Sequence, residues 1–442
     1  RRHRGQDIDG FWWDVYEWLV SEPDRRKDAG FVLGSLGFRN DAGRLSKSII
    51  ESFFQGSLRT SVTRLERFAS CPFAHFAGNI LGLTERELYK LEPPGMGMFM
   101  HEAMSILFSR LDDSKQLAKM GPDEIATFVA EIVEELAPRL QNEILLSSAR
   151  YRYMTRVLRR ILRNSVTALA EHERHSLFQP IGHEIIFGRS GHLPALTIEL
   201  ETGGKVAVRG RIDRVDIAQS EDDCYLRVID YKSSARKLRL SDVYYGLALQ
   251  LLVYLLAAME NRERLTKTKA RPAGALYFPM TDPIISAKGP LDDDELEKQR
   301  MKRLRMNGII VGDADVIRLM DSRVEAGDQS NLVAAGVTKT GRASRGSGAC
   351  VVEPEKYEVL CKFLKGKLEE LAQEIQSGEI GIKPYKQGTA RACTFCSYKP
   401  VCGLDILIPG NQYRSQRNLK DDEFWSIIQD PGCAPGEKGE RA

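Results

Sequence analysis

Two short charged segments constrain this 442-residue chain more than any other feature. Residues 210–216 read Gly-Arg-Ile-Asp-Arg-Val-Asp, and residues 228–232 read Val-Ile-Asp-Tyr-Lys. Each segment predicts a strand, and the polar stretch between them predicts a hairpin that brings Asp213, Asp230 and Lys232 together. Two carboxylates and an ammonium group at a sheet edge suit a hard divalent cation and a water that attacks a phosphate. The hairpin therefore predicts a metal-dependent nuclease.

The spacing within the second strand supports this interpretation. Asp230 and Lys232 are two residues apart, so their side chains point to the same face of a strand. An Asp-x-Lys triplet alone is a weak signal, because alternating charges are common on strands. Its position after an Asp-bearing strand, beside apolar Val228 and Ile229, strengthens it. The carboxylates would hold Mg²⁺ or Mn²⁺, and the lysine would orient water or stabilise the phosphorane charge.

Two further segments carry candidate site residues. Gln250 and Tyr254 are four apart in a predicted helix over about 242–260, and so share one face. A buried helix with two paired polar residues explains them equally well. His101 lies in the first turns of a helix expected to begin near Gly97. A lone histidine is more often structural than a ligand, although imidazole can complete an oxygen-based site and suits Mn²⁺ better than Mg²⁺.

In chain order these segments give Gly-x-x-x-His, Gly-x-Ile-Asp-x-Val, Asp-Tyr-Lys and Gln-x-x-x-Tyr. This order resembles the RecB-type branch of the PD-(D/E)XK nucleases. The resemblance implies an α/β fold, with a restriction-endonuclease-like core, a mixed central sheet and flanking helices. The roles that it implies are metal binding by His101, Asp213, Asp230 and the Tyr231 carbonyl, catalysis by Lys232, and DNA binding and site ordering by Gln250 and Tyr254. Glu184 resembles an acidic residue on the family's first core strand, where we expect a structural role.

Three of the eight cysteines crowd the C-terminal part. Cys393, Cys396 and Cys402 have the spacing C-x2-C-x5-C, which leaves a fourth ligand to come from elsewhere. Cys71 is the best candidate, because it closes a predicted helix just before Pro72. Four thiolates can hold a structural Zn²⁺ or a 4Fe–4S cluster, and the ligand types alone favour zinc. The large separation of Cys71 from the triplet is unusual for a zinc module.

That layout resembles the AddB-type subunits of bacterial AddAB helicase–nucleases, in which an Fe–S cluster staples the two ends of the nuclease domain. Shared segments begin at Ser61, Gly82, Tyr244 and Pro384, and the likeness covers roughly residues 55–408. It implies a 4Fe–4S cluster on the four cysteines, a Mg²⁺ (or Mn²⁺) cofactor, single-stranded DNA as substrate, an AddA helicase–nuclease partner and the bacterial cytoplasm. The implied activity is exonucleolytic hydrolysis of phosphodiesters, on the 5′-ended strand, during double-strand break processing for homologous recombination. Two alternatives are a free-standing Fe–S exonuclease of the CRISPR-associated kind and a DNA-binding scaffold with an inactive nuclease site.

The remaining patterns predict the organisation of the chain. We expect residues 1–55 to be the remnant of a preceding helicase-like region or a linker, and residues 56–410 to be the nuclease domain, with a helical insert at 110–177 and an irregular insert at 283–350. Residues 411–442 are expected to be a C-terminal tail that is disordered from 431. Ser61 or Thr63 is expected to cap a helix, with Glu66 completing a capping box from Thr63.

Composition excludes some functions. No apolar run approaches the ~20 residues needed to span a bilayer, so we expect no membrane partner. The chain has no Gly-x4-Gly-Lys-[Ser/Thr] loop, so we expect no ATP hydrolysis by it. A net charge of +3 is too small to predict nucleic-acid binding by itself. The basic residues nearest the hairpin are Arg236, Lys237 and Arg239, and they are the strongest candidates for phosphate contacts.

Overall fold

The fold was analysed in a computed structural model. It describes residues 9–35, 40–54, 57–86, 88–111, 115–140, 143–188, 193–200, 203–220, 223–287, 289–346, 349–408 and 411–430. The end of the chain from 431, which we expected to be disordered, lies outside these residues. Within them, no helix combines the length and the apolar character that crossing a bilayer requires.

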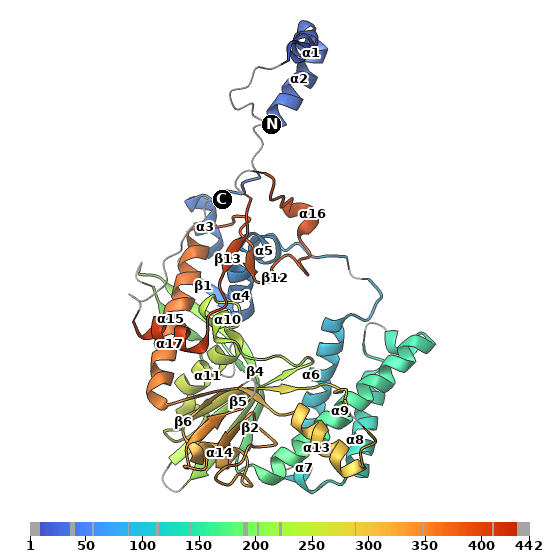
Figure 1. The fold of residues 1–442 in the computed structure, drawn as a ribbon, viewed down its shortest axis with the longest axis vertical. Coiled ribbons are helices and arrows are strands. Elements are labelled where there is room, and N and C mark those ends of the chain that lie inside the picture. Colours follow the sequence, from blue (N-terminus) through green and yellow to red (C-terminus); the bar gives the residue numbers. More distant parts are fainter. Residues whose placement is uncertain are drawn as a thin grey trace.

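A mixed β-sheet forms the centre of the molecule (Figure 1). Its strand order is β1-β4-β5-β6-β7-β10, and β2 and β3 also pair with β4. The antiparallel pairing of β4 with β5, with Arg214 opposite Ile229, confirms the predicted hairpin. The strands are β1 (Ser57–Ser61), β2 (Gln179–Phe187), β3 (Leu196–Glu199), β4 (Lys205–Ser220), β5 (Asp223–Lys232), β6 (Arg271–Pro279), β7 (Asn307–Val311) and β10 (Cys350–Val352).

Helices cover both faces of this sheet, as Figure 1 shows. One core packs α4 (Val62–Ser70), α11 (Gln250–Glu260) and α15 (Pro354–Gln376) on the sheet. The other core contains α6 (Pro93–Ser109), α8 (Pro122–Leu136), α9 (Ala149–His175) and α14 (Ala314–Met320). Val228 of β5 lies in the first core and Ile229 in the second, so this strand is buried on both faces. The expected α/β class with a mixed sheet and flanking helices is confirmed.

The other elements are shorter or peripheral. The helix expected over 242–260 is broken near Gly246, whose φ of 75° belongs to the left-handed region. The remaining helices are α1 (Gly10–Ser21), α2 (Pro23–Ser35), α3 (Lys47–Phe54), α5 (Pro72–His75), α7 (Gln116–Lys119), α10 (Leu240–Tyr244), α12 (Arg262–Thr266), α13 (Asp293–Arg303), α16 (Lys399–Cys402), α17 (Asp421–Gln429), a π-helix (Phe76–Ile80) and a 3₁₀ helix (Ile144–Leu146). The remaining strands are β8 (Ala335–Val337), β9 (Ala343–Arg345), β11 (Tyr385–Gln387), β12 (Ala390–Arg391) and β13 (Arg414–Gln416).

The region 283–350 is not the irregular insert that we expected. It contains β7, a fully buried strand of the central sheet that lies between β6 and β10. Gly308 permits this pairing, because a Cβ at that position would lie 2.3 Å from the Ala275 carbonyl oxygen. A short strand of this kind forms because it pairs with strands that are distant in the sequence. The charged and glycine-rich residues around it give no local signal of that pairing.

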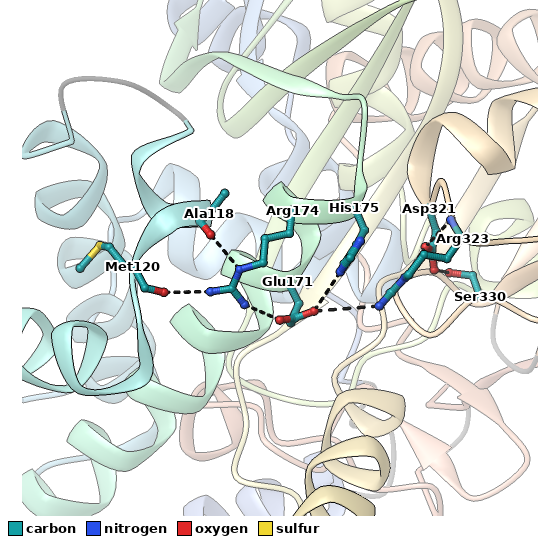
Figure 2. Close-up of polar contacts among 8 residues, drawn as sticks. All are labelled: Ala118, Met120, Glu171, Arg174, His175, Asp321, Arg323 and Ser330. Carbon is teal, nitrogen blue, oxygen red and sulfur yellow. Dashed lines mark hydrogen bonds and ion pairs between the residues drawn. The ribbon is translucent and has the colours of Figure 1, made fainter.

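Polar contacts join the helical insert to the 321–330 segment (Figure 2). Glu171 of α9 pairs with Arg174 and His175 on its own helix and approaches Arg323, with 4.0 Å between Arg323 Nη1 and Glu171 Oε2. Arg174 also donates hydrogen bonds to the carbonyl oxygens of Ala118 and Met120, at 2.7 and 2.8 Å. The helical insert therefore contacts part of the second region that was expected as a separate insert.

Residues 411–430 also differ from the expected tail. Strand β13 pairs with β11, and Phe424 of α17 is fully buried in the first core. Phe424 lies in a largely polar part of the sequence, so the sequence alone does not indicate that it packs into this core. At the other end, α1 and α2 pack on each other and lie apart from the sheet (Figure 1).

Candidate active site

A cleft of about 570 Å³ opens where α6, β2, β4, β5 and α11 meet. The structure brings six predicted side chains together in its lining: His101, Asp213, Asp230, Lys232, Gln250 and Tyr254. Glu184, Arg211, Met98, Glu102, Ser105 and Ile186 complete the lining. Residues from positions 98 to 254 therefore converge on one site.

Three side chains in this cleft offer metal-ligand atoms close together. His101, Glu184 and Asp213 place one such atom each within 4.8 Å of one another, and they form the one such group of three found in the described parts of the chain. His101 Nδ1 lies 3.5 Å from Asp213 Oδ2. The Tyr231 backbone N–H donates to the same Asp213 oxygen at 2.8 Å, which locks the carboxylate on the strand. Glu184, which we expected to be structural, is therefore as well placed for a cation as the predicted ligands.

Burial gives this group unusual electrostatics. Asp213 and Asp230 are only 6% and 1% exposed. Burial, followed by the charge of Asp230, raises the pKa of Asp213 well above its usual range. Burial also lowers the pKa of His101, which favours a neutral imidazole, and its Nδ1 is buried without a hydrogen-bond partner. A divalent cation would relieve the carboxylate repulsion and satisfy that nitrogen, so the residues present fit a metal ion.

A polar relay leads from these carboxylates to α11. Lys232 Nζ lies 2.6 Å from Asp230 Oδ2 and donates to Gln250 Oε1 at 3.1 Å. Gln250 Nε2 in turn donates to the Tyr254 hydroxyl at 3.1 Å. Burial raises the pKa of Tyr254 to about 12, so the phenol stays protonated. The relay fixes the ammonium group of Lys232 beside the carboxylates.

Glu184 and Arg211 form an ion pair at the rim of the cleft. Arg211 Nε lies 2.7 Å from Glu184 Oε2. Glu184 has a φ of 53°, a left-handed conformation that is strained for a residue other than glycine. Burial raises the pKa of Glu184, whereas the Arg211 charge lowers it. Arg211 belongs to the Gly-Arg-Ile-Asp segment, but the motif assigns it no role.

The predicted capping box at Thr63 and Glu66 is wrong. The Ser61 N-cap of α4 makes no side-chain cap hydrogen bond, and Glu66 turns to α11. Its Oε1 accepts the backbone N–H groups of Leu249 and Gln250 at 2.7 and 2.8 Å. The local signal for a capping box was present, but the donors of a distant helix competed for the same carboxylate.

A buried ion network under the cleft was also missed. Arg214 Nε donates to Asp216 Oδ1 at 2.6 Å, and Arg227 Nε donates to Asp216 Oδ2 at 2.9 Å. Arg214 also pairs with Glu173 of α9. Arg214 and Asp216 alternate with Asp213 and so point to the opposite face of β4, where Asp216 lies opposite Arg227 of β5. The Arg-x-Asp spacing after Asp213 was the available signal for this network.

The four predicted cysteines line a second, smaller cavity. Cys71 is buried at the end of α4, and Cys393, Cys396 and Cys402 are half-buried. Burial raises the pKa of the Cys71 thiol, and backbone hydrogen bonds to Ala74, Phe73 and Lys383 oppose that shift. Four sulfur atoms around one cavity are a donor set that fits a thiolate-bound zinc ion or iron–sulfur cluster.

Protein contacts already hold these distant segments together. Asn40 Nδ2 donates to the carbonyl oxygens of Cys402 and Gly403, both at 2.8 Å. Arg414 donates to the carbonyl oxygens of Ala69 and Ser70, just before Cys71. The cysteines therefore meet where the early and late parts of the described chain are joined.

Comparison with known proteins agrees with this geometry. The sequence profile of the PD-(D/E)XK nuclease superfamily matches residues 59–403. The chain belongs to the PD-(D/E)XK nuclease superfamily. Catalysis in this superfamily implies a divalent metal ion, which the cleft residues fit. The profile of the ATP-dependent helicase/deoxyribonuclease AddB fifth domain matches residues 1–35.

Several curated relatives match nearly the whole of this chain. Each is named as the B subunit of an ATP-dependent helicase/deoxyribonuclease. The protein from Desulforamulus reducens is 39% identical over 427 residues, which are 96% of this chain and 37% of the relative. The proteins from Bacillus anthracis and Desulforudis audaxviator are 39% and 38% identical over 425 residues each, covering 36% of each relative. The chain thus spans little more than a third of the length of these relatives. The resemblance to AddB-type subunits that the motifs indicate is confirmed.

Proposed function

We propose that this chain is the nuclease part of an AddB-type subunit, a metal-dependent exonuclease that hydrolyses phosphodiester bonds of single-stranded DNA. The observation that carries the proposal is the convergence of His101, Asp213, Asp230, Lys232 and Gln250 in one cleft. Two buried carboxylates, an imidazole and an ammonium group have no comparable use in a purely binding surface. This favours an active nuclease over an inactive scaffold.

The proposed ligands of Mg²⁺ are His101, Asp213, Asp230 and the Tyr231 carbonyl, with Glu184 close enough to join them. The ion would supply a nucleophilic hydroxide and neutralise charge on the scissile phosphate. Lys232 has the catalytic role, because its ammonium group lies beside Asp230 and can orient the attacking water or stabilise the anionic transition state. Gln250 holds Lys232, and Tyr254 holds Gln250.

The proposed DNA path runs past β5 and the segment that follows it. The Arg236 guanidinium lies over the Tyr277 ring, 5.7 Å from its centroid, near Lys232 over the same ring. Arg236 can contact phosphate from that position. Arg239, in contrast, donates to Asn418 at 2.5 Å and is engaged within the protein.

We assign a 4Fe–4S cluster, rather than zinc, to Cys71, Cys393, Cys396 and Cys402. The four sulfurs line one cavity, but Cys71 lies far from the C-terminal triplet in the sequence, which is unusual for a zinc module. The resemblance to AddB-type subunits also supports a cluster. The proposed cluster staples the ends of a nuclease domain over residues 56–410, extended by β13 and α17.

The cellular role rests on the relatives' names and the motifs. We propose that residues 1–55 join the nuclease to a helicase-like region, supported by the AddB fifth-domain match. An AddA-type helicase–nuclease would be the partner, the 5′-ended strand at a double-strand break the substrate, homologous recombination the process and the bacterial cytoplasm the location.

Degradation of end-labelled single-stranded DNA with and without Mg²⁺ tests this function. We expect Mg²⁺-dependent cleavage, a loss of at least about 10³-fold in Asp230→Ala, and wild-type activity in Asp282→Asn, a partly exposed carboxylate paired with Arg160. Labels at the 5′ and 3′ ends report the polarity. Activity that persists in Asp230→Ala would refute the site, and equal activity in EDTA would refute metal dependence.

A further inference from the structure

The N-terminus of α11 depends on a side chain from another helix. Leu249, the N-cap residue, provides no side-chain cap, and the first turn of α11 has no acidic residue. Glu66 of α4 fills this role, since its Oε1 accepts both the Leu249 and the Gln250 N–H groups. A carboxylate at this position also complements the positive end of the helix dipole.

The residue capped in this way is the one that holds the catalytic lysine. Gln250 is the first residue of α11, and its side chain joins Lys232 to Tyr254. Its backbone is fixed by Glu66 and its side chain by Tyr254, so Gln250 Oε1 has little freedom to move. The hydrogen-bonded series therefore runs from Glu66 through Gln250 and Lys232 to Asp230.

Stabilisation of α11 alone does not account for Glu66. Nine of the eleven residues of α11 are buried, from Leu251 to Met259, so apolar packing already holds the helix on the sheet. What packing leaves unspecified is the orientation of the first turn, where Gln250 lies. Glu66 also approaches Lys232 and Arg236 closely enough to interact with their charges.

We propose that Glu66 is a positioning residue for the nuclease reaction, which acts by capping α11 and thereby holding Gln250 against Lys232. The inference rests on the proposed nuclease function. Glu66 acts through Gln250 on the position of the ammonium group. It contributes nothing to metal binding, because the proposed ligands come from α6, β2, β4 and β5.

The test is a double-mutant cycle on kcat with single-stranded DNA and Mg²⁺. Glu66→Met keeps the side-chain length and removes the acceptor, and Gln250→Ala removes the relay. We expect each to lower kcat by about 10- to 100-fold, since small misplacements in an active site have effects of this size. The double variant should be no slower than Gln250→Ala alone, because both changes break the same series.

Three further variants separate positioning from folding. Glu66→Gln retains an amide oxygen that can accept both N–H groups, so its kcat should stay within about threefold of wild type. Asp292→Ala removes an equivalent cap on α13, where Asp292 Oδ1 accepts the Glu295 N–H at 2.7 Å, and should leave kcat unchanged. If Glu66→Met does not fold, Glu66→Asp takes its place, because the shorter carboxylate cannot reach both N–H groups.

Mn²⁺ affinity, measured by calorimetry without DNA, should be the same within about twofold in every variant, because the ligand set is untouched. Multiplicative losses in the double variant, normal kcat in Glu66→Met, or a parallel loss of Mn²⁺ affinity would each overturn the proposal. An inactive wild-type protein would overturn the nuclease function itself, so the two failures are distinguishable.

Discussion

The proposed catalytic cleft and the cysteine cavity are connected by helix α4, yet they are built in opposite ways. The carboxylates and the lysine of the cleft project from the paired strands β4 and β5, and Asp213 and Asp230 are almost completely buried. The cysteines come from segments more than 300 residues apart, and three of the four are half-buried. The pairing of β4 with β5 fixes the carboxylates, whereas the cavity joins distant segments that hydrogen bonds hold and that a bound metal group would hold further. Helix α4 carries Glu66, which caps α11 next to the cleft residue Gln250, and it ends at Cys71 in the cavity.

Removing one cysteine should therefore affect stability far more than removing a cleft residue. We expect Cys71→Ser to lose bound iron and to lower the melting temperature by roughly 5–10 °C, because the proposed staple closes a very long loop. Iron content, absorbance near ~400 nm and thermal melting measure this in anaerobically purified protein.

Cys350→Ser is the control, because Cys350 is half-buried, like Cys393, Cys396 and Cys402, but lies outside the cavity. It should retain both the iron and the melting temperature. A Cys71→Ser protein that melts with the wild type would show that hydrogen bonds such as those of Asn40 and Arg414 suffice to join the chain ends. Stoichiometric zinc in colourless protein would reverse the choice of metal.

The same contrast explains what the sequence could predict. Asp213, Asp230 and Lys232 were predictable because a hairpin fixes their register locally. The C-x2-C-x5-C spacing and the position of Cys71 before Pro72 indicated the four cysteines, but only the resemblance implied a cluster rather than zinc. Glu66 and β7 were mispredicted because each has a partner in another part of the chain, Glu66 on α11 and β7 on β6.

Acid should weaken the scaffold of the cleft through His172. This residue of α9 is 1% exposed, and burial, followed by the charges of Arg227 and Arg214, lowers its pKa to about 3. The unfolded chain binds a proton near pH 6.5 and the folded chain does not, so stability is fully present above pH 6.5 and is lost as the pH falls. Between pH 6.5 and 5 this amounts to about 2 kcal/mol.

Urea unfolding of metal-free protein at these two pH values measures the effect. His172→Leu should make the pH dependence shallower without removing it, because burial also lowers the pKa values of His75 and His183 to about 4. An unchanged slope in His172→Leu would place the acid-sensitive group elsewhere, with the cysteine region as the next place to look.

The smallest expected effect is a change in Mn²⁺ affinity when Arg211, at the rim of the cleft, is replaced. Arg211 pairs with Glu184, which lies within ligand distance of His101 and Asp213, so a cation that recruits Glu184 must compete with the guanidinium. Arg211→Ala should therefore strengthen Mn²⁺ binding by about two- to fivefold, the range expected for a solvent-exposed ion pair.

Calorimetric titration without DNA measures this affinity, and Arg209→Ala is the matched control, since it removes a positive charge from the same strand outside the cleft lining. Tighter Mn²⁺ binding in Arg211→Ala but not in Arg209→Ala would show that the Arg211 guanidinium occupies Glu184 until the metal ion replaces it. Equal increases in Mn²⁺ affinity in both variants would show that the effect comes only from the lower net positive charge. Weaker binding in Arg211→Ala would mean that the ion pair holds the strained Glu184 in place for the metal, so that the cleft, like the cysteine cavity, depends on a contact for its shape.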